Sequence, residues 1–366
     1  MSAPLDEDGA NMTSTGRNST DNATIHNVAA ITVDPQIQYD IDNDVDTDYS
    51  DRELNDATFS VTSTIYNYRE ENGRTYHRYK DGAYLMPNDE MEKDRLDIVH
   101  HMYLVLLEGH LTLAPIDTEK PLKVLDVGTG TGIWAMAMAD HLSEDSEAIG
   151  TDLSPIQPGW VPANCRFEID DAENEWTYDT NHFDFIHTRH LSQSIRDWPA
   201  YISRLYDHLR PGGWIEIAEH GLRCYSDDGS FPLDSPLALY TEKLCEFGRR
   251  EGFLVSSNPG NKLKEMVIQA GFTDVRHVPY NLPWGPWAED ERLKELGRWA
   301  FITFKTGAAA YGLALLTRVG GITGEDAQRI CNDAINTLND WRLHVYNFHH
   351  FIIARKPMPG EVVATV

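Results

Sequence analysis

A glycine-rich turn lies between an apolar run and a helical run, and this order constrains the fold more than any other feature. Residues 122–127 form the apolar run, residues 128–132 read Gly-Thr-Gly-Thr-Gly, and residues 133–141 have helical character. A short apolar run bounded by a turn predicts a buried strand. Glycines in a strand-to-helix turn let the backbone approach a ligand, which then faces the amino end of the helix. We therefore expect a ligand site at the carboxyl end of a strand.

Strands and helices alternate after this turn. Further strands are predicted at residues 148–151, 165–169, 183–188 and 214–218. Apolar residues at helical spacing predict a helix before the last of these strands: Trp198, Tyr201, Ile202, Leu205 and Leu209. We expect that helix to stop at the Pro-Gly-Gly of residues 211–213. Alternation of this kind predicts an α/β fold with a parallel sheet.

The regularity changes after Glu219. Residues 233–270 are predicted to be helical, 273–278 to form a strand, 287–343 to be mostly helical, and 344–355 to form a final strand. The second helical stretch is too long for a plain connection. We expect an insertion there, which either forms a lid over the substrate or adds packing to the sheet.

The amino-terminal third differs in composition. Residues 1–57 are rich in Asp, Asn, Thr and Ser, so they are predicted to be a disordered acidic tail. Residues 58–121 are expected to form an N-terminal cap with a helix of about 20 residues, opened by Pro-Asn-Asp at residues 87–89. Its predicted apolar face is Ile98, Met102, Val105 and Leu106. The predicted division continues with a cofactor-binding core at 122–220 and the rest of the sheet at 221–366.

Charge and composition exclude several classes of function. With 31 Lys and Arg against 58 Asp and Glu, the formal charge is −27, and the absence of a basic run argues against direct nucleic-acid binding. The four cysteines form no Cys-x-x-Cys pair, and neither His100-His101 nor His349-His350 makes a ligand set, so no metal site is predicted. An apolar leader and a membrane-spanning run are not apparent. We expect a cytoplasmic or nuclear protein.

The residues around the glycine turn specify the cofactor further. Ile133 stands where a dinucleotide-binding turn would carry its last glycine. Asp126 lies two residues before the first glycine, where it can orient the turn and attract a cationic ligand. Asp152, with Leu153 beside it, lies 20 residues after Gly132 at a predicted strand end, where its carboxylate can accept hydrogen bonds from ribose hydroxyls.

Other residues complete the predicted cofactor site. Asp170, Asp171 and Ala172 close the third strand, where they would either read an adenine edge or cap a turn. Arg189 would either pair with an acidic residue of the site or cap its loop. Together with Asp126, Gly128, Thr129, Gly130, Gly132 and Asp152, these residues favour S-adenosylmethionine (SAM).

Two tyrosines upstream have alternative roles. Tyr76 and Tyr84 belong to an aromatic segment that would either close over the cofactor, where aromatic faces can meet a sulfonium, or pack in the core.

Methyl transfer from a sulfonium needs little catalytic apparatus, because the activated methyl belongs to the cofactor. The protein supplies alignment and, for some acceptors, a base. Candidate bases at the expected sheet edge are His187, His190, Glu219 and His220, each of which has a structural role as its alternative.

Sequence motifs along the folded part resemble the LaeA-like family of fungal methyltransferases. They are Glu-Asn-Gly-Arg-Thr-Tyr-His at 71–77, Pro-Asn-Asp-Glu at 87–90, Asp-Arg-Leu-Asp at 94–97, the glycine turn, Asp-Leu-Ser-Pro-Ile-Gln-Pro at 152–158, Phe-Asp-Phe-Ile-His at 183–187, Pro-Gly-Gly-Trp at 211–214 and Ala-Arg-Lys-Pro at 354–357. The resemblance covers residues 66–357. It implies a class I methyltransferase: a Rossmann-like seven-stranded sheet with the seventh strand antiparallel, and SAM as methyl donor.

The resemblance leaves two functions open. One is methylation of a small molecule in fungal secondary metabolism. The other is a regulatory role exerted through velvet-type or zinc-finger protein partners, with methylation of a protein or of the chain itself.

Overall fold

Seven strands form one sheet in the computed structural model, which describes residues 29–35, 68–76, 85–256 and 259–361. The strand order is β5-β4-β3-β6-β7-β9-β8. The strands are β3 (Lys123–Val127), β4 (Glu147–Asp152), β5 (Cys165–Ile169), β6 (Phe183–Arg189), β7 (Leu209–His220), β8 (Thr273–Pro283) and β9 (Tyr346–Arg355). β9 runs antiparallel to both neighbours, whereas β3 to β7 are mutually parallel. The predicted sheet, with its seventh strand antiparallel, is therefore confirmed.

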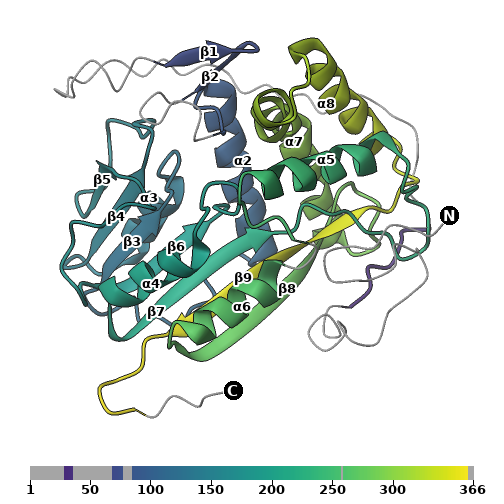
Figure 1. Cartoon of the computed structure of the whole chain (residues 1–366). Helices are drawn as coiled ribbons and strands as arrows, with labels where there is room; N and C mark the ends of the chain where they lie inside the picture. The colour runs from purple at the N-terminus through teal and green to yellow at the C-terminus, as the bar shows by residue number, and fades with distance from the viewer. Residues whose placement is uncertain (1–28, 36–67, 77–84, 257–258, 362–366) are drawn as a thin grey trace.

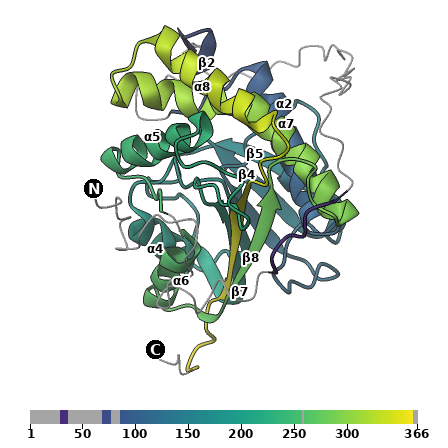
Figure 2. The same ribbon diagram turned by 90° about the vertical axis from the view of Figure 1, so that its right-hand side faces the viewer.

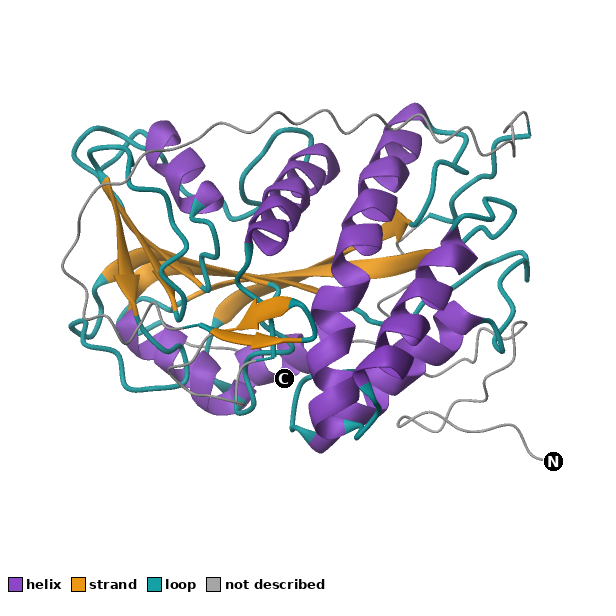
Figure 3. Ribbon diagram, turned by 90° about the horizontal axis from the view of Figure 1, so that it is seen from above, coloured by secondary structure: helices purple, strands orange, loops and turns teal. Residues whose placement is uncertain are grey.

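Helices cover both faces of this sheet, which Figure 3 shows edge-on. On one face lie α2 (Glu90–Leu106), α3 (Ile133–His141) and the first half of α7 (Glu291–Ala314); on the other lie α4 (Trp198–His208) and α6 (Pro259–Gln269). Alternate residues of one strand serve the two faces, as in β3, where Val124 packs under α2 and α3 and Leu125 under α4 and α6. Two-sided burial explains why the strands read as continuous apolar runs.

The helix α2 begins as the sequence indicates and buries a face that differs slightly from the predicted one. The Asp89 side chain caps it by accepting a hydrogen bond from the amide of Glu92. Its buried apolar residues are Val99, Met102, Tyr103 and Leu106, whereas Ile98 and Val105 are only half-buried. The predicted face was therefore offset by about one residue, because α2 packs between the sheet and α7 rather than on a single neighbour.

The prediction that α4 continues through Leu209 to the Pro-Gly-Gly of residues 211–213 was wrong. The helix ends at His208, and both Leu209 and the Pro-Gly-Gly belong to the first part of β7, because Leu209 has an extended backbone and pairs with β6. The pairing of β6 with β7 shifts there, from Phe183 opposite Leu209 to Phe185 opposite Trp214. Gly212 takes a positive φ of 82°, which accommodates this irregular start. β7 is consequently longer than the predicted 214–218.

The carboxy-terminal helices gather at one end of the sheet. Figures 1 and 2 both show α5 (Pro236–Arg250), α7 and α8 (Gly324–Leu338) grouped there. The second half of α7 packs on α5 and α8 in a separate hydrophobic cluster, and a π-helical turn, η1 (Leu315–Val319), extends it. The stretch predicted as a helical insertion thus packs on the sheet and on its neighbouring helices, which is one of the two roles expected of it; its role as a lid over the substrate stays a prediction.

One helix among the described residues is long and apolar enough to cross a membrane. It is the run Glu291–Val319, with a mean hydropathy of 1.2 in its most apolar window. Half of that window is buried in the structure, against α2, the sheet, α5 and α8. Burial of this kind is what the core helix of a folded domain shows.

Segments from the amino-terminal part contact the folded core. Val33 bridges Ala288, and Asp34 pairs with Lys294 at 2.6 Å. A short hairpin of β1 (Arg69–Glu71) and β2 (Arg74–Tyr76) is joined to the start of α2 by the Arg74–Asp89 ion pair at 2.5 Å. The rest of the predicted tail lies outside the described residues.

Candidate functional site

The glycine turn has a backbone that only glycine adopts readily. Gly128, Gly130 and Gly132 all have positive φ, at 72°, 59° and 80°. A Cβ on Gly132 would lie 2.2 Å from the ring of Phe167, and one on Gly128 would lie 2.5 Å from Leu191. The turn is therefore packed against β5 and the loop after β6. Its backbone is fixed further, because the amides of Gly128 and Thr129 both donate to the carbonyl of Thr151 on β4.

A buried carboxylate fixes the turn from behind. Asp126 accepts a hydrogen bond from the Thr129 hydroxyl at 2.6 Å and bonds Nδ1 of His187 at 2.7 Å. His187 in turn stacks on Trp134, with ring centroids 3.8 Å apart and planes 6° from parallel. Because all four side chains are at least nine-tenths buried, this network has no direct access to a substrate. We assign His187 a positioning role rather than that of a base.

Asp152 lies at the end of the neighbouring strand β4 and faces the turn. Its carboxylate accepts hydrogen bonds from the amides of Gly130 and Ser154, both at 2.9 Å. Burial raises the pKa of this carboxyl to about 6, although the two amide hydrogen bonds favour the ionised form. The side chain lines the cavity beside the turn, where it can exchange these bonds for ribose hydroxyls.

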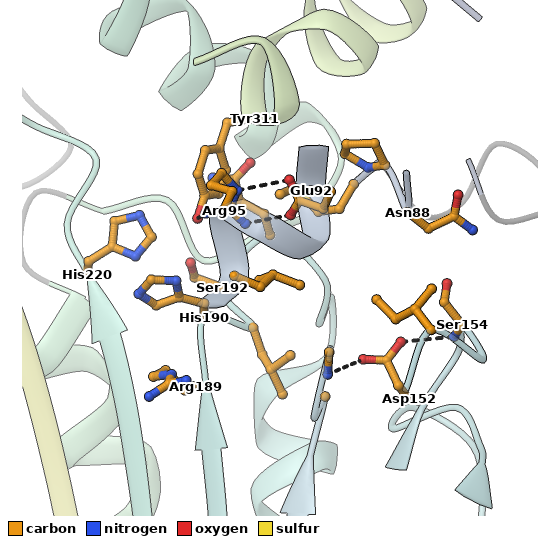
Figure 4. A pocket seen from close by; sticks show the side chains of 18 residues that line it. Asn88, Glu92, Arg95, Asp152, Ser154, Arg189, His190, Ser192, His220 and Tyr311 are labelled. Carbon is orange, nitrogen blue, oxygen red and sulfur yellow. Dashed lines mark hydrogen bonds and ion pairs between the residues drawn. The ribbon is translucent and has the colours of Figure 1, made fainter. Parts of the chain in front are cut away.

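This first cavity lies along the carboxyl edge of β3, β4 and β6 (Figure 4). The start of α2 forms its far wall. There Arg95 is 1% exposed and makes a two-pronged ion pair with Glu92, at 2.5 and 2.9 Å. Asn88 Nδ2 and Gln193 Nε2 are buried at its lining and have no hydrogen-bond partner within the described residues.

The features of the first cavity fit SAM. Glycine is required in the turn, because a Cβ at Gly130 would lie 3.1 Å from Leu96 on the opposite wall and a larger side chain would fill the space between them. The Asp152 carboxylate can accept hydrogen bonds from ribose hydroxyls. The unpartnered side-chain amide nitrogens of Asn88 and Gln193 can donate hydrogen bonds to a carboxylate of the cofactor. When bound, the cofactor would supply the activated methyl.

A second cavity adjoins the first. It lies between α5, α7 and the ends of β7, β8 and β9, and its lining is largely apolar. The two cavities share His190, His220 and Tyr311 in their linings. These three side chains therefore mark the junction, which Figure 4 shows with His190 and His220 side by side above the strand ends.

Histidines dominate this junction, and burial keeps them neutral. His190 follows β6 with a strained positive φ of 59°, and its ring centroid lies 4.4 Å from that of His220. Burial lowers the pKa of His220 to about 4, and lowers the pKa of His190 and of His349 well below the usual range. The Tyr103 hydroxyl bridges Nε2 of His190, at 2.8 Å, and Nδ1 of His349, at 2.9 Å.

Comparison with known proteins decides the family. Residues 98–277 match the methyltransferase domain family. Methyltransferase pytC of Aspergillus terreus is 39% identical over 86% of this chain and 96% of its own length. The secondary metabolism regulator LAE1 of Cochliobolus heterostrophus is 36% identical over 78% of this chain and 94% of its own, and laeA of Aspergillus fumigatus is 35% identical over 82% and 80%.

The chain belongs to the LaeA-like family of fungal methyltransferases. It is a SAM-dependent methyltransferase with the class I Rossmann-like fold. Among solved structures, phosphoethanolamine N-methyltransferase 2 of Haemonchus contortus, in complex with S-adenosylhomocysteine, is 17% identical over 72% of this chain and 58% of its own, with a TM-score of 0.43.

In this LaeA-like protein, several predicted site residues meet at the first cavity. Gly128, Gly130, Asp152, Arg189 and His190 line it. Asp126, Thr129, Gly132 and His187 lie just behind, where they support the turn. Within the part of the chain that the structure describes, Arg189 forms no ion pair; its guanidinium lies 4.8 Å from the centroid of the Tyr103 ring. Burial lowers the pKa of Arg189, and Tyr103 partly offsets this effect.

Other predicted residues lie away from the cavity lining. Asp170 and Asp171 cap the turn after β5, since Asp171 accepts the Glu173 amide at 2.9 Å, while Ala172 packs under α4. Leu153 is half-buried beside Asp152. Contact of these four residues with an adenine ring stays a prediction.

The two tyrosines proposed as a lid have different outcomes. Tyr76 is 1% exposed and packs in the cluster of α5, α7 and α8, with Arg318 over its ring at 4.7 Å. Its alternative role, core packing, is the one in the structure, because α7 and α8 cover it. Tyr84 lies outside the described residues.

The sequence reading missed the contribution of α2. Arg95 and Asn88 belong to motifs that indicate the family but not a contact with the cofactor. Tyr311 lies in a helix of ordinary composition, so no sequence pattern predicts its place at the site.

Glu219, one of the predicted bases, is fully buried. Its carboxylate accepts hydrogen bonds from the amides of Leu191 and Ser192 at 2.6 and 3.1 Å, so it positions the loop that bears His190. Among the described residues, no three His, Cys, Asp or Glu side chains gather to hold a metal ion.

Proposed function

We propose that this LaeA-like methyltransferase transfers the methyl group of SAM to a small molecule of fungal secondary metabolism. The observation that carries the proposal is the second cavity, which adjoins the cofactor cavity at His190, His220 and Tyr311. Its lining is mostly apolar with a few polar groups among them, Thr303, Asn347 and the histidines, which is the composition that small-molecule sites favour. Its cover by α5 and α7 suits an acceptor that is enclosed.

The test supplies methyl-labelled SAM and a fungal metabolite extract to the purified protein. We expect label in small molecules, each heavier by one methyl group than a partner in the untreated extract. The Gly130→Trp variant, whose cofactor cavity is filled, serves as the control. Label that appears only in protein would overturn the proposal.

A second candidate is a regulatory role with a protein acceptor. Relatives named as regulators of secondary metabolism support it, as does laeA of Emericella nidulans, named a protein-methionine methyltransferase and 33% identical over 82% of this chain. In this chain Met86 lines the cofactor cavity, which places a thioether near the donor site. Intact-protein mass after incubation with SAM tests this: a one-methyl gain that Met86→Leu abolishes would favour it. Recovery of velvet-type or zinc-finger proteins in a pulldown would add support.

A further inference from the structure

We propose that the second cavity binds an uncharged, flat, unsaturated acceptor through its rings, and that His220 accepts the proton of the hydroxyl that is methylated. This inference rests on the proposed small-molecule function and specifies its acceptor. It assigns the chemical class of the ligand, its location, and the group that acts on it.

The lining of the cavity selects against charged molecules. No side chain among its described lining residues carries a carboxylate, an ammonium or a guanidinium group. An acceptor that carried a charge would therefore lose hydration without gaining a partner. An amine acceptor, protonated at neutral pH, would meet this cost, whereas a phenol-like hydroxyl would not.

Aromatic rings give the cavity a preference for flat ligands. Trp284 and Phe304 lie with ring centroids 4.7 Å apart, and Tyr240 meets Phe304 edge-on at 5.9 Å. Leu222, Leu244 and Leu282 complete the apolar surface. Ring faces of this kind pack on unsaturated rings in offset or edge-on arrangements.

His220 is the group placed to receive a proton. It follows at the end of β7 and lines both cavities, so an acceptor hydroxyl next to it would also face the methyl donor. Its Nδ1 is buried and has no hydrogen-bond partner within the described residues. By contrast, Nε2 of His190 is engaged by the Tyr103 hydroxyl, so His190 is the positioning residue of the pair.

The surroundings keep His220 uncharged, so its ring nitrogen is able to accept a proton. Facing it are His190 from the end of β6, His349 from β9 at 5.6 Å, and Tyr311 from α7 at 5.9 Å between ring centroids. From α2, Arg95 adds a positive charge that lowers the pKa of His220, as burial does to a greater extent. No facing group is a carboxylate that would favour the imidazolium.

The cofactor, the acceptor hydroxyl and His220 account for every bond and proton of the methyl transfer. The bond between sulfur and the methyl carbon breaks, and its electron pair stays on sulfur. The acceptor oxygen forms the new bond to carbon, and its hydroxyl proton passes to Nδ1 of His220. Thr303, whose buried hydroxyl on α7 has no hydrogen-bond partner within the described residues, is available to a second polar atom of the acceptor.

The binding test uses 2-naphthol as the probe and the protein saturated with S-adenosylhomocysteine. We expect 2-naphthol to bind by calorimetry at least tenfold more tightly than 2-naphthoate or 2-naphthylmethylamine, which carry opposite charges on the same rings. Thr303→Trp on α7 and Leu222→Trp in the segment after β7 should each weaken 2-naphthol binding at least tenfold and leave S-adenosylhomocysteine affinity within twofold. Thr303→Val, which keeps the shape, is the matched control.

The proton-transfer test uses the emission of bound 2-naphthol, which differs between its neutral and ionised forms. His220→Leu should lower the ratio of ionised to neutral emission, while His277→Leu, a histidine away from both cavities, should leave it unchanged. An unchanged ratio in His220→Leu would overturn the role of His220. Equal binding of the three naphthyl probes, or no probe binding by a protein that binds S-adenosylhomocysteine, would overturn the acceptor class while leaving the proposed function standing.

Discussion

The two cavities at the sheet edge are built in opposite ways. The cofactor cavity contains charged side chains among apolar ones, namely Glu92, Arg95, Asp152 and Arg189, and near neighbours in the chain fix several of them, such as Asp152 with Ser154 and Arg95 with Glu92. The second cavity is made of apolar side chains and neutral histidines from α2, α5, α7 and four strand ends. This contrast indicates that the first cavity binds one charged cofactor through specific polar contacts. The second cavity selects its ligand mostly by shape and by the absence of charge.

The largest effect is expected from filling the first cavity. In Gly130→Trp the indole would occupy the cofactor space, in addition to the strain of a positive φ, so SAM binding should fall below detection by calorimetry. Gly229→Trp is the matched control, because Gly229 also has a positive φ, 75°, and open space around it. Retained SAM affinity in Gly130→Trp would mean that the cofactor does not use this turn.

A smaller effect is expected at Asp152. Asp152→Asn should weaken SAM binding by about 1–3 kcal/mol, since a charge-assisted hydrogen bond to the ribose becomes a neutral one. Because the pKa of Asp152 is raised to about 6, affinity of the wild type should fall as the pH drops through 6. Calorimetry between pH 5 and 8 tests both points; an equal decline in Asp152→Asn would exclude this carboxyl as the titrating group.

The histidine junction should make stability depend on pH. His220 folds with its pKa lowered to about 4, below the ordinary value of the unfolded chain, so its contribution is complete above about pH 6.5 and is lost as the pH falls toward 4. Between pH 7 and 5 this contribution should decrease by about 1–2 kcal/mol. Buried Glu219 and Asp152, whose pKa values are raised, act in the opposite direction.

Comparison of the wild type with a His220 variant isolates the contribution of this histidine to the pH dependence of stability. Urea unfolding of the wild type and of His220→Gln at pH 7 and pH 5 should show a smaller acid loss in the variant. If the two proteins lose the same free energy of unfolding on acidification, His220 does not fold in its neutral form.

The smallest effect is expected behind the turn. Thr129→Val keeps the shape but removes the hydroxyl that donates to Asp126 at 2.6 Å, so the free energy of unfolding should fall by about 1 kcal/mol. Thr129→Ser keeps the hydroxyl and should stay closer to the wild type in the same urea titration. A loss in Thr129→Ser as large as that in Thr129→Val would assign the effect to packing of the methyl group instead.

The sequence predicted the cofactor half well because its signals are local. α3 and β5 were predicted with their bounds, since glycines, an acidic residue and apolar runs follow one another in the chain. The buried face of α2 was placed about one residue away, and Tyr76 belonged to the core rather than to a lid. Both depend on α7 and α8, which begin more than 180 residues further along the chain.

The sequence by itself determined the α/β alternation, the glycine turn and the acidic residue at the end of β4, because backbone geometry and hydrogen bonds there involve near neighbours. Only the tertiary structure decided that Arg95 lines the cofactor cavity, that His190 and His349 meet at the Tyr103 hydroxyl, and that His220 packs against both histidines. These side chains come from elements whose contact depends on how the helices pack across the sheet. Burial, which no local pattern encodes, then makes the histidines neutral and the second cavity selective.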